Sequence, residues 1–239
     1  MTKKEEWLAG TRSAVPIMLG YVPVGIAYGV MARQAGLNTW QTVLMSLTVY
    51  GGASEMMAAG MVAQGAAVLT IVLTTFILNL RHIIMSTCVF NQMQGGRLPV
   101  RMLAAFGVTD ETFAVYTTTA NAPRTPRYFF SMALCSYLSW ALGSWLGAIA
   151  TGLLPPLITA ALGISLYAMF IGLLMPGLHG NGRLAALVVL TALCNTVLCN
   201  VVQLDSGWSM ILSTLGCAAL GSLFVTPNAA GEENSHAEP

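Results

Sequence analysis

The sequence predicts an all-α fold, a polytopic transmembrane helix bundle with 7-8 membrane segments. Of the 239 residues, 56% are hydrophobic and only 8% are charged, and the mean hydropathy is +0.71. Soluble domains carry roughly 25% charged residues. Several apolar stretches also reach the roughly 20 residues that a helix needs to cross the hydrocarbon core. We therefore expect a multi-pass protein of the cell (inner) membrane, surrounded by the lipid bilayer.

The apolar stretches define the expected elements in chain order. An additional apolar segment, about 102–119, carries Asp110 and Glu111, so it either spans the membrane, re-enters it or lies in the interface. The connecting loops are short, which predicts a single transmembrane domain over residues 1–227 followed by a disordered acidic tail, 228–239. The predicted spans cover roughly 13–32, 42–63, 67–89, 129–152, 157–176, 185–203 and 208–225.

Orientation depends on that additional segment, because basic residues favour cytoplasmic loops. If 102–119 spans, the rule favours an internal N-terminus; if it does not, the rule favours an external one. Both alternatives place the C-terminus inside. A weak internal echo is compatible with an inverted repeat, a common transporter architecture, or with chance in so apolar a chain. The echo pairs Leu19-Gly20, Gly29 and Asn38 with Leu162-Gly163, Gly172 and Asn181.

Small residues at a spacing of four recur in two predicted spans. Gly25 and Gly29 lie in the first span, and Gly143 and Gly147 in the span 129–152. This pattern lets helix backbones approach closely. It predicts either packing within one chain or a dimer interface.

Three polar clusters, at 51–55, 79–82 and 109–112, interrupt the apolar segments. An ionised carboxylate such as Glu55 costs several kcal/mol in a bilayer, and the glycines just before it weaken the helix there. Costly charges beside broken helices are typical of transporter substrate sites. The clusters contain the residues that we predict to bind substrate or couple transport: Gly51, Gly52, Ser54, Glu55, Asn79, Arg81, His82, Asp110 and Glu111.

Depth along ideal helices predicts which charges meet. Arg81 lies about 8 residues before the end of its span and Asp110 about 8 after the start of its segment, so both lie on the order of 12 Å deep. They are level and can form an ion pair. Glu55 and Arg81 differ in depth by roughly 9 Å, which only a helix break at Gly51-Gly52 or the reach of the arginine can close.

Each charged residue also has a purely structural interpretation. The sole role of the Arg81–Asp110 pair could be to fix the register of the two helices. Glu55 could be a protonated, hydrogen-bonded acid in the core. His82 could face the other side of its helix. The polar side of the segment 185–203, with Thr191, Asn195, Asn200 and Gln203, fits interhelical hydrogen bonds as well as a site lining.

No enzyme signature occurs in the sequence. HExxH, GxSxG and phosphate-loop motifs are absent, and His82, His179 and His236 lack the spacing of a zinc site. The five cysteines lie in apolar segments without a CxxC pair, which is typical of buried small hydrophobes. We expect no enzyme, no cofactor, no metal and no nucleic-acid partner, and any active transport must draw on a gradient or a partner.

The polar clusters also carry a family resemblance. The matching stretches are Gly52-Ala53-Ser54-Glu55, Asn79-Leu80-Arg81-His82, Thr109-Asp110-Glu111-Thr112 and 166–176, LYAMFIGLLMP. In this order they resemble the AzlC-type branched-chain amino-acid permeases, the large subunit of the LIV-exporter family. The resemblance implies export of valine, leucine, isoleucine and methionine, and a small AzlD-like membrane partner. Many members carry glutamine where this chain has Glu55.

The leading hypothesis is a secondary transporter that exports branched-chain amino acids, driven by an ion or proton gradient. Backbone N–H groups after Gly51-Gly52 and the guanidinium of Arg81 would bind the substrate carboxylate. Glu55 or Asp110 would bind the ammonium or carry a proton. Two alternatives are an exporter of another small solute and a non-transporting assembly or sensor subunit. The apolar substrate side chain would contact Met56, Met57, Phe76 and Met169.

Overall fold

The computed structural model describes residues 2–96, 98–119, 122–153, 181–204 and 206–224, with isolated residues between 155 and 178. All regular structure in these ranges is helical, as the sequence predicts. The chain divides into two compact units, Met1–Ile171 and Gly172–Pro239, each of which is described by itself. The single domain predicted over 1–227 stays a prediction.

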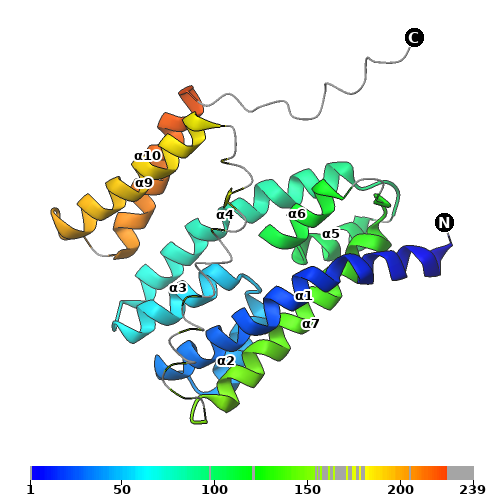
Figure 1. The fold of residues 1–239 in the computed structure, drawn as a ribbon, viewed down its shortest axis with the longest axis horizontal. Helices are drawn as coiled ribbons and strands as arrows, with labels where there is room; N and C mark the ends of the chain where they lie inside the picture. Colours follow the sequence, from blue (N-terminus) through cyan, green and yellow to red (C-terminus); the bar gives the residue numbers. More distant parts are fainter. Residues whose placement is uncertain are drawn as a thin grey trace. The chain divides into compact units, whose positions relative to one another are not determined.

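The first unit contains seven described helices (Figure 1). The longest, α1, begins at a capping box in which Thr2 and Glu5 exchange side-chain and backbone hydrogen bonds, and it continues through Pro16 and Pro23. The predicted span 13–32 lies within it. The seven are α1 (Lys3–Gln34), α2 (Thr39–Thr48), α3 (Gly52–Ala63), α4 (Val68–Gln92), α5 (Leu98–Phe106), α6 (Asp110–Thr118) and α7 (Pro126–Ala150).

Helices α1 and α7 lie side by side and carry much of the buried core (Figure 1). Their glycines face each other. A Cβ added to Gly25 would lie 3.1 Å from the Cα of Gly143, and one added to Gly29 would lie 2.7 Å from the backbone nitrogen of Ala148. A Cβ on Gly147 would lie 2.8 Å from the backbone of Ile26. The prediction that these glycines serve packing within the chain is therefore confirmed.

Two predicted segments are not continuous helices. The stretch 42–63 forms α2 and α3, separated at 49–51, where Tyr50 adopts a φ of 47° and Gly51 an extended φ of −139°. The stretch 102–119 forms α5 and α6, separated at 107–109. The glycines of the first break and the N-cap preference of Thr109 in the second explain why each helix stops and restarts.

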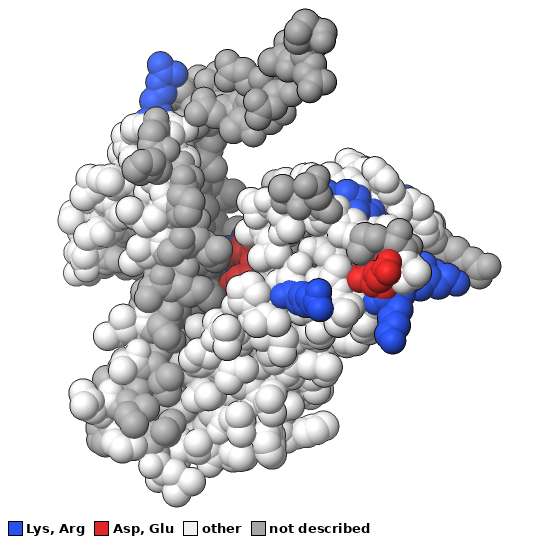
Figure 2. All heavy atoms as spheres, turned by 45° about the vertical axis from the view of Figure 1, so that its right-hand side comes forward, with Lys and Arg blue, Asp and Glu red and all other residues white. Residues whose placement is uncertain are grey.

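Four of the described helices have the length and apolar composition needed to cross a bilayer: α1, α4, α7 and α9. The count of 7-8 membrane segments and the inverted repeat therefore stay predictions. The span 157–176, the repeat residues Leu162, Gly163 and Gly172, and the tail 228–239 lie wholly or largely outside the described residues. On the face drawn in Figure 2, large areas carry no charged side chain, as expected for a surface in contact with lipid.

The described residues of the second unit include two helices that pack together, α9 (Gly182–Asn200) and α10 (Ser206–Phe224). Asn181 caps α9 by accepting from the backbone nitrogen of Leu184 at 3.1 Å. Between the helices, Ser209 Oγ donates to Asn195 Oδ1 at 2.7 Å. For Asn195, the structure thus shows the interhelical hydrogen bond that was one of the two alternatives left open by the sequence.

Candidate functional site

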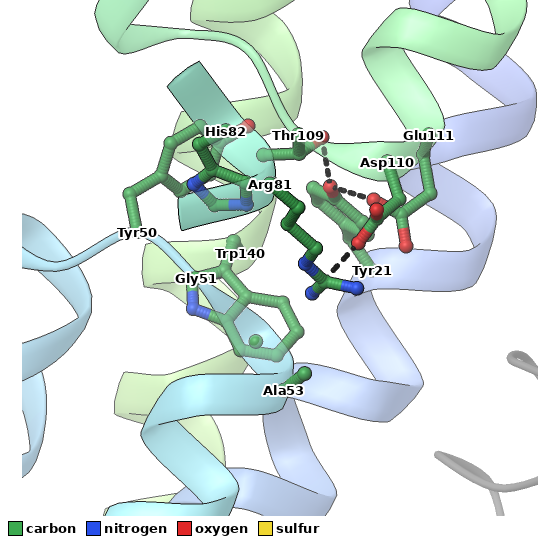
Figure 3. Close-up of a pocket in the computed structure, with 11 residues that line it drawn as sticks. Tyr21, Tyr50, Gly51, Ala53, Arg81, His82, Thr109, Asp110, Glu111 and Trp140 are labelled. Carbon is green, nitrogen blue, oxygen red and sulfur yellow. Dashed lines mark hydrogen bonds and ion pairs between the residues drawn. The ribbon is translucent and has the colours of Figure 1, made fainter. Parts of the chain in front are cut away.

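The two helix breaks of the first unit lie at one small cavity (Figure 3). The break before α3 and the break before α6 supply its walls, together with side chains from α1, α4 and α7. The space open to the centre of a water molecule is about 20 Å³, which is room for about one water. The lining consists of Tyr21, Tyr50, Gly51, Gly52, Ala53, Arg81, His82, Thr109, Asp110, Glu111 and Trp140.

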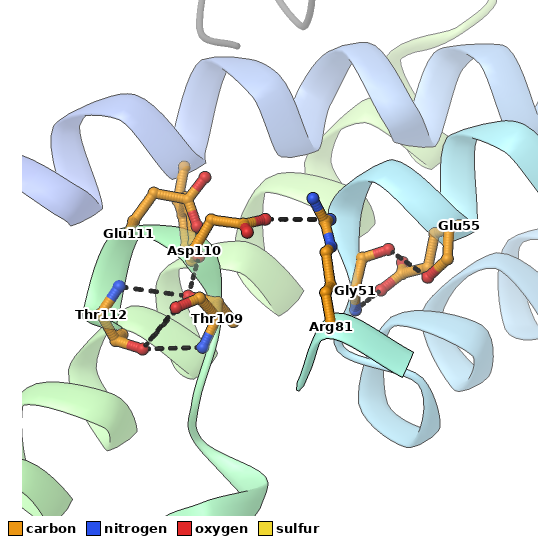
Figure 4. A network of polar contacts seen from close by, with 9 residues as sticks. Gly51, Glu55, Arg81, Thr109, Asp110, Glu111 and Thr112 are labelled. Atoms are coloured by element: carbon orange, nitrogen blue, oxygen red, sulfur yellow. Dashed lines mark hydrogen bonds and ion pairs between the residues drawn. The ribbon is translucent and has the colours of Figure 1, made fainter. Parts of the chain in front are cut away.

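Arg81 of α4 forms an ion pair with Asp110 at the start of α6. The Nη2–Oδ2 distance is 2.9 Å, so the pairing predicted from helix depth is confirmed. The Arg81 side chain is 34% exposed and that of Asp110 24%, so the pair is neither buried nor fully solvated. Figure 4 shows the Arg81 guanidinium between the two breaks, directed toward Asp110.

Glu111 supplies a second carboxylate to the same wall. The phenol of Tyr21, on α1, donates to Glu111 Oε2 at 2.6 Å and lies 2.7 Å from the hydroxyl of Thr109. Thr109 also caps α6, because its side chain accepts from the backbone nitrogen of Thr112. The loop before α6 is thereby held at the cavity by hydrogen bonds to α1 and to α6 itself.

Glu55 is completely buried and lies behind the cavity wall. Its Oε1 accepts from the backbone nitrogen of Gly51 at 2.9 Å, and its Oε2 lies 2.9 Å from the hydroxyl of Ser46. The indole nitrogen of Trp140 donates to both oxygens, at 3.3 and 3.2 Å. Because Gly51 and Trp140 line the cavity, Glu55 positions the wall without reaching the cavity itself.

The break at Gly51-Gly52 is fixed from several sides. Ser54 is buried and its hydroxyl donates to the carbonyl oxygen of Gly51 at 2.8 Å. A Cβ on Gly52 would lie 2.8 Å from the ring of Trp140, so only glycine lets this ring pass so closely. Tyr50 is in the left-handed region, a strained conformation that neighbouring packing must hold.

His82 and Asn79 occupy different places relative to the cavity. His82 lines it beside Arg81, so the alternative in which His82 faces away is wrong. Asn79 is half-buried; its Oδ1 is enclosed near Gly51 and accepts no hydrogen bond from the described residues.

The residues predicted to contact the apolar part of a substrate are not those at the cavity. Met56 and Met57 do not belong to the described lining, and Phe76 is 61% exposed on α4; Met169 lies outside the described residues. Aromatic side chains that the sequence analysis did not select take that place: Tyr21, Tyr50 and Trp140. The one feature of the sequence that could have identified them is that each carries a polar group on an aromatic ring within an apolar segment.

The site therefore combines one guanidinium, two carboxylates and aromatic walls at two helix N-termini. Such termini leave their first N–H groups without intrahelical partners and attract anions. The arrangement can bind a small molecule that carries both charges, one beside Arg81 and one beside Asp110 or Glu111. These features define a helical membrane protein with a charged cavity at paired helix breaks.

Comparisons with known proteins identify the family. The model of the AzlC protein family matches residues 16–154, which include both breaks. The chain belongs to the AzlC family. It is 33% identical to an uncharacterized membrane protein of Archaeoglobus fulgidus over 188 residues, which cover 78% of this chain and 82% of the relative.

Two further relatives carry names. The inner membrane protein YgaZ of Escherichia coli is 30% identical over 227 residues, 91% of this chain and 89% of that protein. The branched-chain amino acid transport protein AzlC of Bacillus subtilis is 27% identical over 157 residues, 62% of this chain and 61% of that protein. No solved structure matches significantly.

Proposed function

We propose that this protein is a secondary transporter that exports branched-chain amino acids, with a small AzlD-like membrane subunit as its partner and an ion or proton gradient as its energy source. Family membership and the name of the Bacillus subtilis relative support transport of this substrate class. The observation that carries the proposal is the cavity, which places one cation and two carboxylates at the two helix breaks.

An amino-acid zwitterion suits this charge arrangement. Its carboxylate can replace Asp110 as the partner of Arg81 and can accept hydrogen bonds from the backbone N–H groups in the first turn of α3. Its ammonium can then pair with the released Asp110 or with Glu111. When the ammonium pairs with Asp110, binding exchanges partners without leaving either member of the original ion pair unpaired, because the substrate brings one charge of each sign.

An apolar substrate side chain would pack against Trp140 and Tyr50. The cavity of about 20 Å³ is far too small for a whole amino acid. Binding therefore requires the segments at 49–51 and 107–109 to separate, and we take the structure to represent a closed state. Helix breaks are the places where such a change requires few lost hydrogen bonds.

The deciding experiment is counterflow of labelled valine in proteoliposomes, made with and without the small subunit. We expect uptake that unlabelled leucine, isoleucine and methionine compete for, and loss of uptake in Arg81→Ala. Arg127→Ala is the matched control, because Arg127 is 53% exposed in a long contact with Glu6 and lies away from the cavity. Equal activity of Arg81→Ala and Arg127→Ala would remove the carboxylate role of Arg81.

Two alternatives have distinct outcomes in the same assay. Competition only by solutes outside this class would indicate an exporter of another small molecule. Absence of counterflow under both conditions, with folded protein, would indicate a non-transporting assembly or sensor subunit. The cavity and its mixed charges favour transport over that second alternative.

A further inference from the structure

Glu55 belongs to a chain of hydrogen-bonding groups that connects α3, α2 and α7. Its Oε2 lies 2.9 Å from Ser46 Oγ, Ser46 Oγ lies 2.7 Å from Ser144 Oγ, and Ser144 Oγ lies 2.9 Å from the carbonyl oxygen of Trp140. The side chains of Glu55, Ser46 and Ser144 are all fully buried. Three oxygen–oxygen contacts in this chain therefore each need one proton.

The two hydroxyl groups supply only two protons, because a serine side chain donates once. The carbonyl oxygen of Trp140 can only accept, so the contact at that end uses the proton of Ser144. Ser144 then accepts from Ser46, which uses the second proton. The third contact, between Ser46 and Glu55, is a hydrogen bond only if the carboxyl group carries the proton and donates it to Ser46.

An ionised Glu55 requires the opposite arrangement. Ser46 then donates to Glu55 and Ser144 donates to Ser46. The carbonyl oxygen of Trp140 keeps its helical N–H donor and loses its hydroxyl contact. The two charge states thus differ by the rotation of two hydroxyl groups, and no buried polar group is left unsatisfied in either.

We propose that Glu55, Ser46 and Ser144 form a proton-binding site, and that the structure represents its proton-loaded state. Release breaks the O–H bond of Glu55, passes the proton to a water molecule that enters at the break before α3, and reverses both hydroxyl groups; nothing is oxidised or reduced. The titratable groups that face Glu55 are the phenols of Tyr28, Tyr50 and Tyr137. Phenols remain protonated at neutral pH, so the carboxyl is the member of this cluster that exchanges a proton.

As the coupling element of the transporter, this site rests on the proposed function. Glu55 bonds to Gly51 and Trp140, which line the cavity, so a change of its charge acts directly on the wall. Ser46 and Ser144 are positioning residues that decide how readily the carboxyl keeps its proton. Glu55→Gln preserves the loaded arrangement, because an amide can donate to Ser46 while its oxygen accepts from Gly51 and Trp140.

Infrared spectroscopy of the purified full-length protein tests the proton site without transport. At neutral pH we expect a band of a protonated carboxyl group that Glu55→Gln removes. Ser144→Ala frees the proton of Ser46 for the carboxylate, so the band should weaken strongly, whereas Ser144→Thr should retain it. Ser139→Ala is the matched control, because the Ser139 hydroxyl likewise donates to a backbone carbonyl of α7, that of Ser136 at 2.7 Å, and has no part in the chain from Glu55 to Ser144.

Identical spectra of the wild type and Glu55→Gln would overturn the proposal, and so would an unchanged band in folded Ser144→Ala. Transport gives a separate result. A valine counterflow that fails while the band behaves as expected contradicts the proposed function and leaves the proton site intact. Full valine transport with unaltered pH dependence in Glu55→Gln contradicts the coupling role instead.

Discussion

Substitutions at Arg81 and Asp110 can distinguish a structural role of this ion pair from a role in substrate binding. Either single substitution to alanine removes the ion pair, at a cost between that of an exposed pair, about 0.2–1 kcal/mol, and a buried one, about 3–5 kcal/mol. We expect the exchange variant, Arg81→Asp with Asp110→Arg, to recover thermal stability in detergent without recovering valine transport. Recovery of both would reduce the pair to a helix-register device.

Thr109 gives a second prediction at the same scale. It caps α6 and contacts Tyr21, so Thr109→Val removes both hydrogen bonds while keeping the shape of the side chain. Loss of an N-cap costs about 1 kcal/mol, within a range of about 0.5–2 kcal/mol. We expect a lower melting temperature for Thr109→Val and near wild-type melting for Thr109→Ser. Equal melting of the two variants would contradict the capping role.

Two sets of contacts show how much of the site could be predicted from the sequence: the Arg81–Asp110 pair and the partners of Glu55. The pairing of Arg81 with Asp110 was predicted from the constant rise of ideal helices, and the structure brings the two residues together although the segment 102–119 is broken at 107–109. The partners of Glu55 could not be predicted, since Ser46 and Ser144 are 98 residues apart and serines barely alter hydropathy. Only tertiary packing brings these hydroxyl groups to the carboxyl.

Among the helices, the glycine contact of α1 with α7 makes the sharpest prediction. Gly29→Ala places a methyl group against the α7 backbone, with 2.7 Å to Ala148, and backbone cannot rotate away as a side chain can. Overpacking of this kind costs about 1–3 kcal/mol. Gly20→Ala on the same helix meets nothing within 4 Å and serves as control. We expect only Gly29→Ala to lower the melting temperature; equal melting of both would contradict the close contact.

Helix boundaries show where sequence patterns succeed and where they fail. The length of the apolar stretches predicted α1, α4 and α7. In a continuous membrane helix nearly every residue is either buried in the protein or in contact with lipid, so nearly every residue is apolar. The two glycines at Gly51-Gly52 indicated the first break in the sequence. The break at 107–109 is indicated only by Gly107 and a threonine, and the hydropathy is continuous across it, so the sequence did not predict that the segment 102–119 forms two helices.

At the level of the whole molecule, the proposed transport requires the cavity to open. Ala53 lines it, whereas the neighbouring Ser54 is fully buried and does not. With the five native cysteines replaced, single cysteines at these two positions report on the opening. A cationic thiol reagent should react slowly with Ala53→Cys when the protein is empty, because about 20 Å³ admits little more than water. Valine, by shifting the population toward open states, should change that rate.

The neighbouring position is the control for this measurement. Ser54→Cys should stay unreactive with and without valine, since Ser54 is held behind the wall by its bond to the Gly51 carbonyl. Reaction of Ser54→Cys at the rate of Ala53→Cys would mean that the wall at Gly51-Gly52 does not persist in the membrane. A rate at Ala53→Cys that valine leaves unchanged would mean that substrate does not act on this cavity. A valine-dependent rate confined to Ala53→Cys links the helix break, the Arg81–Asp110 pair and substrate access in one protein.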